Sequence, residues 1–540
     1  MTAPGTEDRP TGQSTALMRS ALMHNSMPVE DIRDVIHREV ELRRATVHGL
    51  YEEIAELQSI HNLVAPINSL PPELLNMIFS CVEDATTENT DLISVTHVCR
   101  HWRDIALHAP ILWTRIALKH PEGVRTFLDR SKALPLRVSL STEKLPIVAT
   151  VRSLTAEIHR TRVLRVSIPP SLALDVVTQK LLQATPKLEE LFLERLQLPP
   201  GARRPTVALP EVTPVEYDGA PLLRSLILRG MRLPYLPKGP CALTNICLEG
   251  ALPTLFVLLD LLERSPFLEN LRIHGPFNED LNEDPRLVSL AHLKTLDIYS
   301  FPAAGIAALL PSLELPAQTN VTLNATLDFG DDFSEVMPAY TSAAPLPMGC
   351  LQGSKRLQLV WTHHELTLQA YRGAEEFHTP ALQITAIFLE PRPGPRFFGD
   401  WPLDTAQVES VVLCGSFTRR HPYDFAITTE RWAEMLPALP AVRTLRVMSV
   451  GNRTLEDLVG ELVKERREPL CPHLEAVEFF DVFPRKVFWQ NLTGVVKGRV
   501  PKAGGTLVRM EFFNVEGAAA WLDGLAPLAG ELEGFVAASE

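Results

Sequence analysis

Two runs of metal-binding residue types stand out in the sequence, and neither completes a metal site. Residues 280–284 read Asp-Leu-Asn-Glu-Asp and begin like a calcium-binding loop. Such a loop needs Gly at its sixth position and a bidentate Glu at its twelfth, where this chain has Pro285 and Ala291. The His-His-Glu run at 363–365 would place neighbouring histidines on opposite faces of a strand, which favours surface histidines. We therefore expect no metal and no cofactor.

Catalytic signatures are also absent from the sequence. It contains no G-x-S-x-G, G-x-x-x-x-G-K-[ST], G-x-G-x-x-G or H-E-x-x-H motif, so the commonest hydrolase, nucleotide-binding and zinc-enzyme patterns are missing. An enzyme would have to assemble its catalytic groups from separate loops. We expect a protein that is not an enzyme.

The composition and charge of the chain disfavour some classes of binding partner. The 540-residue chain has a net charge of −13 and no Lys/Arg-rich run, which argues against nucleic acid as a partner. No apolar run reaches the ~18 residues of a membrane span, and no signal peptide is evident. The 7 cysteines include no C-x-x-C pair, as is typical of reduced thiols. We expect a cytoplasmic and/or nuclear protein that does not bind a membrane.

The elements that would position a binding site begin after a disordered tail, expected over residues 1–28. Residues 29–64 are predicted to form one long helix with a heptad-like seam, which consists of Ile36, Val40, Val47, Leu50, Ile54, Leu57 and Val64, with Arg43 and His61 at the two remaining positions. The helix is either a short coiled coil that pairs two copies of the chain or an amphipathic helix folded back on its own protein. A homodimer through 29–64 is therefore one of two open alternatives.

A second helix start follows at Leu-Pro-Pro-Glu, residues 70–73. Proline fits the first helical turn and Glu73 complements the helix dipole there. The apolar residues Leu74, Leu75, Ile78, Phe79 and Val82 then recur at helical spacing and form one stripe. A further helix is predicted from Asp91 to Ala106, after an acidic loop over residues 83–90.

Together with Val-Cys-Arg-His-Trp-Arg at 98–103 and Leu-Trp at 112–113, this stretch resembles an F-box. The F-box is a three-helix module that docks on the small adaptor subunit of cullin-RING ubiquitin ligases, and we place it at residues 65–118. The resemblance implies that the adaptor is bound by Leu70, Pro71, Pro72, Glu73, Leu74, Ile78, Val98 and Trp102. The alternative is an ordinary helical hairpin with a tryptophan-filled core.

Residues 130–540 contain a different repeating pattern of apolar residues. The phrase L-x-x-L-x-L, in strict or degenerate form, starts at residues 188, 223, 243, 268 and 293 and again at 408, 442, 474 and 507. Spacings of 20 to 29 residues are typical of leucine-rich repeats, and in each phrase the fourth and sixth residues face the same side of a short strand. The fold class expected is α/β: a helical segment and a three-helix F-box, then a leucine-rich-repeat-like solenoid with parallel strands on its concave face and helices outside. The interval 300–406 interrupts the rhythm as an atypical insert with either antiparallel strands or a pair of unusual repeats.

Residues that alternate with the buried positions of these strands would form a recognition surface, in which charges and aromatic anchors suit protein binding. The candidate target-binding residues are Phe192, Arg229, Arg272, Tyr299, Arg446, Phe480 and Phe513. The first hypothesis is a substrate-recognition subunit of a cullin-RING (SCF-type) ubiquitin ligase, whose partners are the adaptor and an unknown target protein. The second is a non-catalytic repeat scaffold that no longer binds the adaptor.

Overall fold

The computed structural model describes most of the chain: residues 16, 19, 20, 23, 28–84, 89–117, 121–141, 154–168, 185–196, 215–217, 220–231, 235–250, 253–275, 286–327, 352–362, 364–373, 379–388, 404–416, 427–464, 466, 469–500, 504–524 and 536–538. The calcium-loop-like run 280–284 and His363 lie outside the described residues, as does most of the predicted tail. The chain divides into two compact units. The first comprises Met1–Ala117 with Thr126–Leu134, and the second comprises Leu118–Arg125 with Pro135–Glu540.

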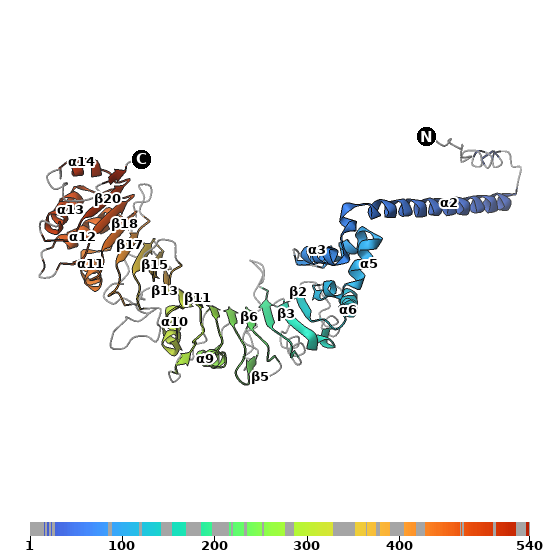
Figure 1. Ribbon diagram of the computed structural model, residues 1–540, viewed down its shortest axis with the longest axis horizontal. Coiled ribbons are helices and arrows are strands. Elements are labelled where there is room, and N and C mark those ends of the chain that lie inside the picture. The colour runs from blue at the N-terminus through green and yellow to red at the C-terminus, as the bar shows by residue number, and fades with distance from the viewer. Residues whose placement is uncertain are drawn as a thin grey trace. The chain divides into compact units, whose positions relative to one another are not determined.

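The first unit is helical. Its elements are α2 (Val29–Leu63), η1 (Pro66–Ser69), α3 (Pro72–Asp84), α4 (Thr90–Val98), α5 (Arg100–His108), η2 (Pro110–Trp113) and the short β1 (Arg115–Ile116), and α6 (Pro121–Arg130) contributes its C-terminal half. Figure 1 shows α2 as one long uninterrupted helix. The predicted long helix and the predicted helix start at the proline pair are both confirmed.

The prediction of one helix from Asp91 to Ala106 is wrong, because the helix breaks at Cys99. Cys99 has extended dihedral angles (φ −156°, ψ 168°), and its sulfur accepts a hydrogen bond from the backbone N–H of Trp102, so it serves as the N-cap of α5. The guanidinium of Arg103 donates to the carbonyl of Thr96 at 2.8 Å and satisfies an otherwise free carbonyl at the end of α4. Side chains thus pair two backbone groups at the break, the carbonyl of Thr96 and the N–H of Trp102.

Large apolar side chains fill the core of this unit. Leu75, Phe79, Leu92 and Trp113 are all buried. The indole N–H of Trp113 donates to the carbonyl of Ala106 at 2.8 Å, so its one polar atom is satisfied. The acidic loop ends on buried Asn89, whose amide nitrogen donates to the carbonyl of Arg115 and whose amide oxygen accepts from the N–H of Ala117. Asn89 thus ties this end of the loop to the chain that follows η2.

The second unit is a ladder of strands with helices and turns on one side. The strands are β2 (Leu136–Ser141), β3 (Thr161–Ile168), β4 (Glu190–Arg195), β5 (Val215–Tyr217), β6 (Ser225–Arg229), β7 (Tyr235–Pro237), β8 (Asn245–Glu249), β9 (Asn270–His274), β10 (Val288–Ser289), β11 (Thr295–Pro302), β12 (Leu313–Glu314), β13 (Asn320–Leu327), β14 (Arg356–Trp361), β15 (Glu365–Tyr371), β16 (Leu382–Phe388), β17 (Ser410–Cys414), β18 (Thr444–Met448), β19 (Ala476–Phe480), β20 (Arg509–Phe513) and β21 (Val536–Ala538). The helices are α9 (Leu255–Glu263), α10 (Ala303–Leu309), α11 (Thr429–Met435), α12 (Asn452–Val463), α13 (Lys486–Arg499) and α14 (Ala518–Gly524), with short 3-10 turns η3 (Ile158–Arg160), η4 (Leu310–Ser312) and η7 (Leu436–Ala438).

Equivalent positions of the repeated phrase lie side by side in this ladder. Strands β2, β3, β4, β6, β8, β9, β11 and β13 pair in parallel in that order, and Leu191, Leu226, Ile246 and Leu271 share one row. Strands β17 to β21 form a second parallel run. The parallel, mixed α/β architecture expected from the sequence is present.

The insert joins these two runs without a gap in the ladder. β16 pairs in parallel with β13 and β14 pairs in parallel with β17, while β15 lies between them and is antiparallel to both. Of the two alternatives left open for this interval, the structure has antiparallel strands. From β13 towards β17 these strands follow the order β16, β15, β14, so their order in space is the reverse of their order in the sequence.

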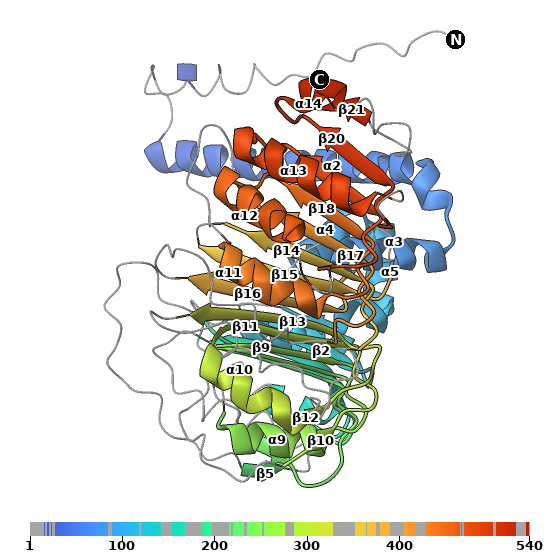
Figure 2. The same cartoon turned by 90° about the vertical axis from the view of Figure 1, so that its left-hand side faces the viewer.

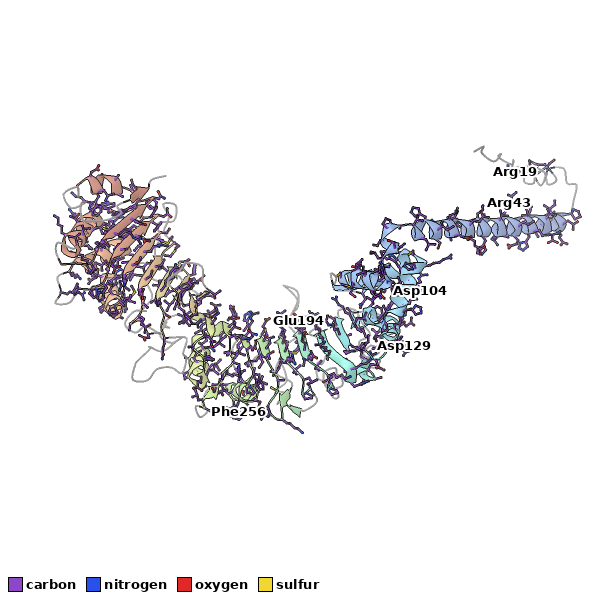
Figure 3. All side chains as sticks on the ribbon, in the orientation of Figure 1. Arg19, Arg43, Asp104, Asp129, Glu194 and Phe256 are labelled. Atoms are coloured by element: carbon purple, nitrogen blue, oxygen red, sulfur yellow. The ribbon has the colours of Figure 1, made fainter. Side chains whose placement is uncertain are left out.

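The two faces of the ladder differ in character. The fourth and sixth residues of the phrases, such as Leu191 and Leu193, are buried, which confirms the predicted alternation. Helices α10 to α13 stack along one side of the strands (Figure 2). Figure 3 places Glu194 on the opposite side from Phe256 of α9, which lies on the helical side. We call the face opposite the helices the open face.

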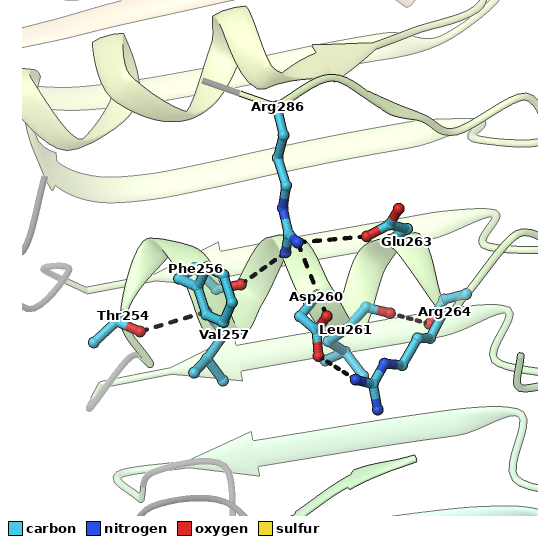
Figure 4. A network of polar contacts seen from close by, with 9 residues as sticks. Thr254, Phe256, Val257, Asp260, Leu261, Glu263, Arg264 and Arg286 are labelled. Atoms are coloured by element: carbon cyan, nitrogen blue, oxygen red, sulfur yellow. Dashed lines mark hydrogen bonds and ion pairs between the residues drawn. The ribbon is translucent and has the colours of Figure 1, made fainter. Parts of the chain in front are cut away.

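Helix α9 is stabilised by an N-cap at Thr254 and by contacts with Arg286 (Figure 4). The hydroxyl of Thr254 accepts from the N–H of Val257, as an N-cap does. Arg286 donates to the carbonyl of Phe256 at 3.0 Å, lies over its ring at 4.9 Å and approaches Glu263 at 3.5 Å. These contacts fasten the outer helix to the start of the next repeat.

Candidate functional site

Helix α3 carries two apolar faces, where the sequence predicted a single stripe. Leu75 and Phe79 are fully buried against the first unit, while Leu74 and Ile78 are exposed. Pro71, just before the helix, and Pro72 and Glu73, its first two residues, are exposed, and Leu70 is half-buried. One face therefore holds the unit together and the other offers apolar surface to a partner.

Met77 belongs to the same exposed face, and the sequence analysis did not select it. Its side chain is 64 % exposed, and it lies three residues after Leu74 and one before Ile78. Ile67 in η1 is exposed as well. The signal that could have found Met77 is its helical spacing from Leu74, which places both on one face.

Val98 and Trp102 differ in their exposure and in their contacts. Val98, the last residue of α4, is 57 % exposed. Trp102 instead packs inward: its ring lies 5.0 Å from that of Phe79, and its indole N–H donates to the side-chain oxygen of Asn68 at 2.6 Å. The break at Cys99 separates the two residues, which an unbroken helix would have placed one turn apart.

Asn68 connects three elements of this unit. Its amide oxygen accepts the Trp102 hydrogen bond, and its amide nitrogen donates to the carbonyl of Asn62, in the last turn of α2. The segment η1, directly before Leu70 and the proline pair, is thereby fixed between α2 and α5. Trp102 is thereby linked through Asn68 to the turn that precedes Leu70.

A second candidate surface lies on the open face of the second unit, in two clusters. In the first cluster, Arg229 lies over the ring of Phe192 at 5.4 Å and forms an ion pair with Glu249 at 2.9 Å. One strand further, Arg272 pairs with Asp297 at 3.2 Å. The ring of Tyr299, the next candidate residue along the ladder, lies 6.4 Å from the ring of His274, a contact that the sequence analysis did not predict.

The second cluster is centred on a buried carboxylate. Glu478 is only 3 % exposed and lies 2.7 Å from both Arg446 and Arg509. Arg446 also lies over the ring of Phe480 at 5.3 Å, and Phe480 stacks on Phe513 at 4.5 Å with the rings 8° from parallel. Arg446, Phe480 and Phe513 therefore form one pre-arranged patch, as candidate residues on neighbouring strands.

The structure does not bring all seven target-binding candidates together. Nine strand-to-strand steps separate β6 from β18 along the ladder. At ~4.8 Å per step, the path along the sheet is about 40 Å. The two clusters are thus separate patches on the open face.

Two titratable side chains of the first cluster, the thiol of Cys247 and the hydroxyl of Tyr299, are kept neutral by a raised pKa. Burial raises the pKa of the Cys247 thiol to about 11, and the Glu249 carboxylate, which accepts its hydrogen bond, acts in the same direction. Burial, with a smaller contribution from Asp297, also raises the pKa of Tyr299. A protonated thiol is a poor nucleophile, so Cys247 is suited to packing and hydrogen bonding rather than to covalent chemistry.

Neither surface contains a metal site among the residues that the structure describes. Within the same residues, no helix has the length and apolar character needed to cross a membrane. What the two surfaces offer is apolar, aromatic and paired ionic contact area, the chemistry of protein recognition.

Comparison with known proteins supports this interpretation for the first surface. The family model described as F-box-like matches residues 67–119, the stretch that contains η1 and helices α3 to α5. No curated protein matches the chain at a significant level. The match covers the exposed face of α3, Val98 and Trp102, and it identifies an F-box-like domain within this chain.

Proposed function

We propose that this protein is a substrate-recognition subunit of a cullin-RING (SCF-type) ubiquitin ligase. The F-box-like domain binds the ligase adaptor, and the repeat array holds a target protein near an enzyme that the chain does not itself contain. The mechanism is one of proximity, because a tethered target has a raised effective concentration at the ubiquitin-transferring subunit. No residue of this chain takes part in bond chemistry.

The observation that carries the proposal is the exposed face of α3 inside the F-box-like match. Leu74, Met77 and Ile78 are exposed on a helix whose opposite face is fully buried. Exposed apolar residues gathered on one side of a rigid helix mark an interaction surface. We assign adaptor contact to Leu70, Pro71, Pro72, Glu73, Leu74, Ile78 and Val98, and a positioning role to Trp102.

Target contact is assigned to the open face. Phe480 and Phe513 present a stacked aromatic pair beside Arg446, and Phe192 with Arg229 forms the second contact point, followed by Arg272 and Tyr299. Aromatic and arginine side chains contribute most to protein interfaces. Because the arginines are held by carboxylates, a partner meets them in fixed positions and little side-chain freedom is lost on binding.

Co-expression with the adaptor, followed by mass spectrometry of the purified complex, tests both assignments. The wild-type chain should retain the adaptor, and a Leu70→Ala, Pro71→Ala double variant should retain much less. A Phe480→Ala, Phe513→Ala variant should keep the adaptor and lose co-purifying target proteins. Phe256→Ala is the matched control, since Phe256 is half-exposed on the helical side of the same unit.

Retention of the adaptor by the Leu70→Ala, Pro71→Ala variant at the wild-type level would contradict the adaptor assignment. A wild-type chain that binds no adaptor would favour the second candidate, a repeat scaffold without a ligase connection. We place the protein in the cytoplasm and/or nucleus, where such ligases act.

A further inference from the structure

The long helix α2 has an exposed apolar seam that the proposed function does not use. Val40, Val47, Ile54 and Leu57 are 40 %, 49 %, 48 % and 66 % exposed, although they recur along one side of a 35-residue helix. Leu50, on the same side, is half-buried. A helix of this length spans about 50 Å, so the seam is a long apolar surface left open by the described chain.

We propose that α2 pairs with α2 of a second copy of this chain in a parallel, in-register, two-stranded coiled coil. The seam follows alternating steps of three and four residues, which define a heptad with positions labelled a to g. The a positions are Val40, Val47, Ile54 and His61, and the d positions are Ile36, Arg43, Leu50, Leu57 and Val64. β-Branched residues at a with leucine at d favour two parallel strands, and the four consecutive layers from Val47 to Leu57 follow this rule closely.

The flanking charges select the parallel orientation. The g positions are Glu39, Thr46, Glu53 and Ile60, and the e positions are His37, Arg44, Tyr51 and Gln58. In a parallel pair each g residue faces the e residue five positions later on the other helix, so Glu39 meets the second copy's Arg44, twice per dimer. An antiparallel pair places g beside g and e beside e. Among these eight residues no g residue is basic and no e residue is acidic, so an antiparallel pairing of this stretch forms no opposite-charge pair between them.

Arg43 is an unfavourable residue for a d position, and its charge is offset within the same helix. Arg43 would place two positive charges in one core layer of the dimer. Its guanidinium lies 3.0 Å from the carboxylate of Glu39, one turn earlier on the same helix. Glu39 therefore lies between Arg43 of its own chain and Arg44 of the second copy, and it offsets the charge that arginine brings to the seam.

Light scattering of the purified full chain tests pairing. The wild type should have the mass of two 60.1 kDa chains. A Val47→Glu, Ile54→Glu variant should be monomeric, because it puts charge at two a positions. The matched control is Ala45→Glu, Ser59→Glu, which adds the same charge at f positions on the other side of the helix and should stay dimeric. Circular dichroism serves as the check that each variant is folded.

Disulfide formation tests orientation and register. In the parallel in-register pair, Ile54→Cys places residue 54 opposite its own copy, and mild oxidation should yield a peptide linked 54 to 54. Ser59→Cys, at an f position, should yield no such link. A monomeric wild type would overturn the proposed pairing, and so would a Val47→Glu, Ile54→Glu variant that remains dimeric. A dimer without the 54 to 54 link overturns the parallel register. None of these outcomes depends on whether the F-box-like domain binds its adaptor.

Discussion

Trp102 links the core of the first unit to the turn that precedes the proposed adaptor-binding residues. Its ring contacts Phe79 in the core, and its N–H holds Asn68, which fixes the turn before Leu70. We predict that Trp102→Phe keeps most of the ring contact and costs about 1 kcal/mol of unfolding free energy for the lost hydrogen bond. Trp102→Ala should cost about 3 kcal/mol or more.

Thermal or urea unfolding of the F-box-like unit, followed by circular dichroism, measures this difference. Equal destabilisation by the two variants would mean that the hydrogen bond to Asn68, rather than the ring, carries the effect. The sequence could assign Trp102 to the F-box through its resemblance. The sequence could not show that Trp102 packs inward, because Phe79 and Asn68, which it contacts, lie 23 and 34 positions earlier in the chain.

At the scale of single elements, α2 contains a residue that weakens it. Gly49 lies inside the helix at a c position, and a Cβ added there would meet no atom within 4 Å. Gly49→Ala should therefore stabilise α2 by about 0.5–1 kcal/mol, because alanine loses less backbone entropy in a helix. Circular dichroism should show a higher melting temperature for the helical signal. A lowered melting temperature would contradict the open surroundings of this position.

Whether a segment forms a helix or a strand could be predicted from the local sequence pattern. The residues at which these elements end were harder to predict. The proline pair at 71–72 predicted the start of α3, because proline fits a first helical turn. The end of α4 at Val98 was not predictable, since it depends on Cys99 acting as a cap and on Arg103 reaching back to Thr96. Leu74 and Leu75 are adjacent and equally apolar. Only the packing of α3 against its neighbours decides that one is exposed and the other buried.

At the scale of the whole chain, repetition made the second unit predictable. Each phrase supplies one strand with the same buried positions, so successive strands pair in parallel with equivalent residues side by side. The insert lacked that repetition. Its three strands could be predicted individually, but their reversed order depends on pairings between β13 and β16 and between β14 and β17, far apart in sequence. For the same reason the sequence could name seven open-face candidates without dividing them into two clusters.

Calorimetric titration of the purified chain with the ligase adaptor tests the central claim most directly, with a Leu74→Glu, Ile78→Glu variant beside the wild type. We predict that the wild type binds and that the variant binds at least about 100-fold more weakly, since each apolar side chain lost from a buried contact costs about 1.5–3 kcal/mol. Leu42→Glu, at an exposed position of α2 away from its seam, should bind like the wild type. Wild-type affinity in the Leu74→Glu, Ile78→Glu variant, or no binding by the wild type, would contradict the account.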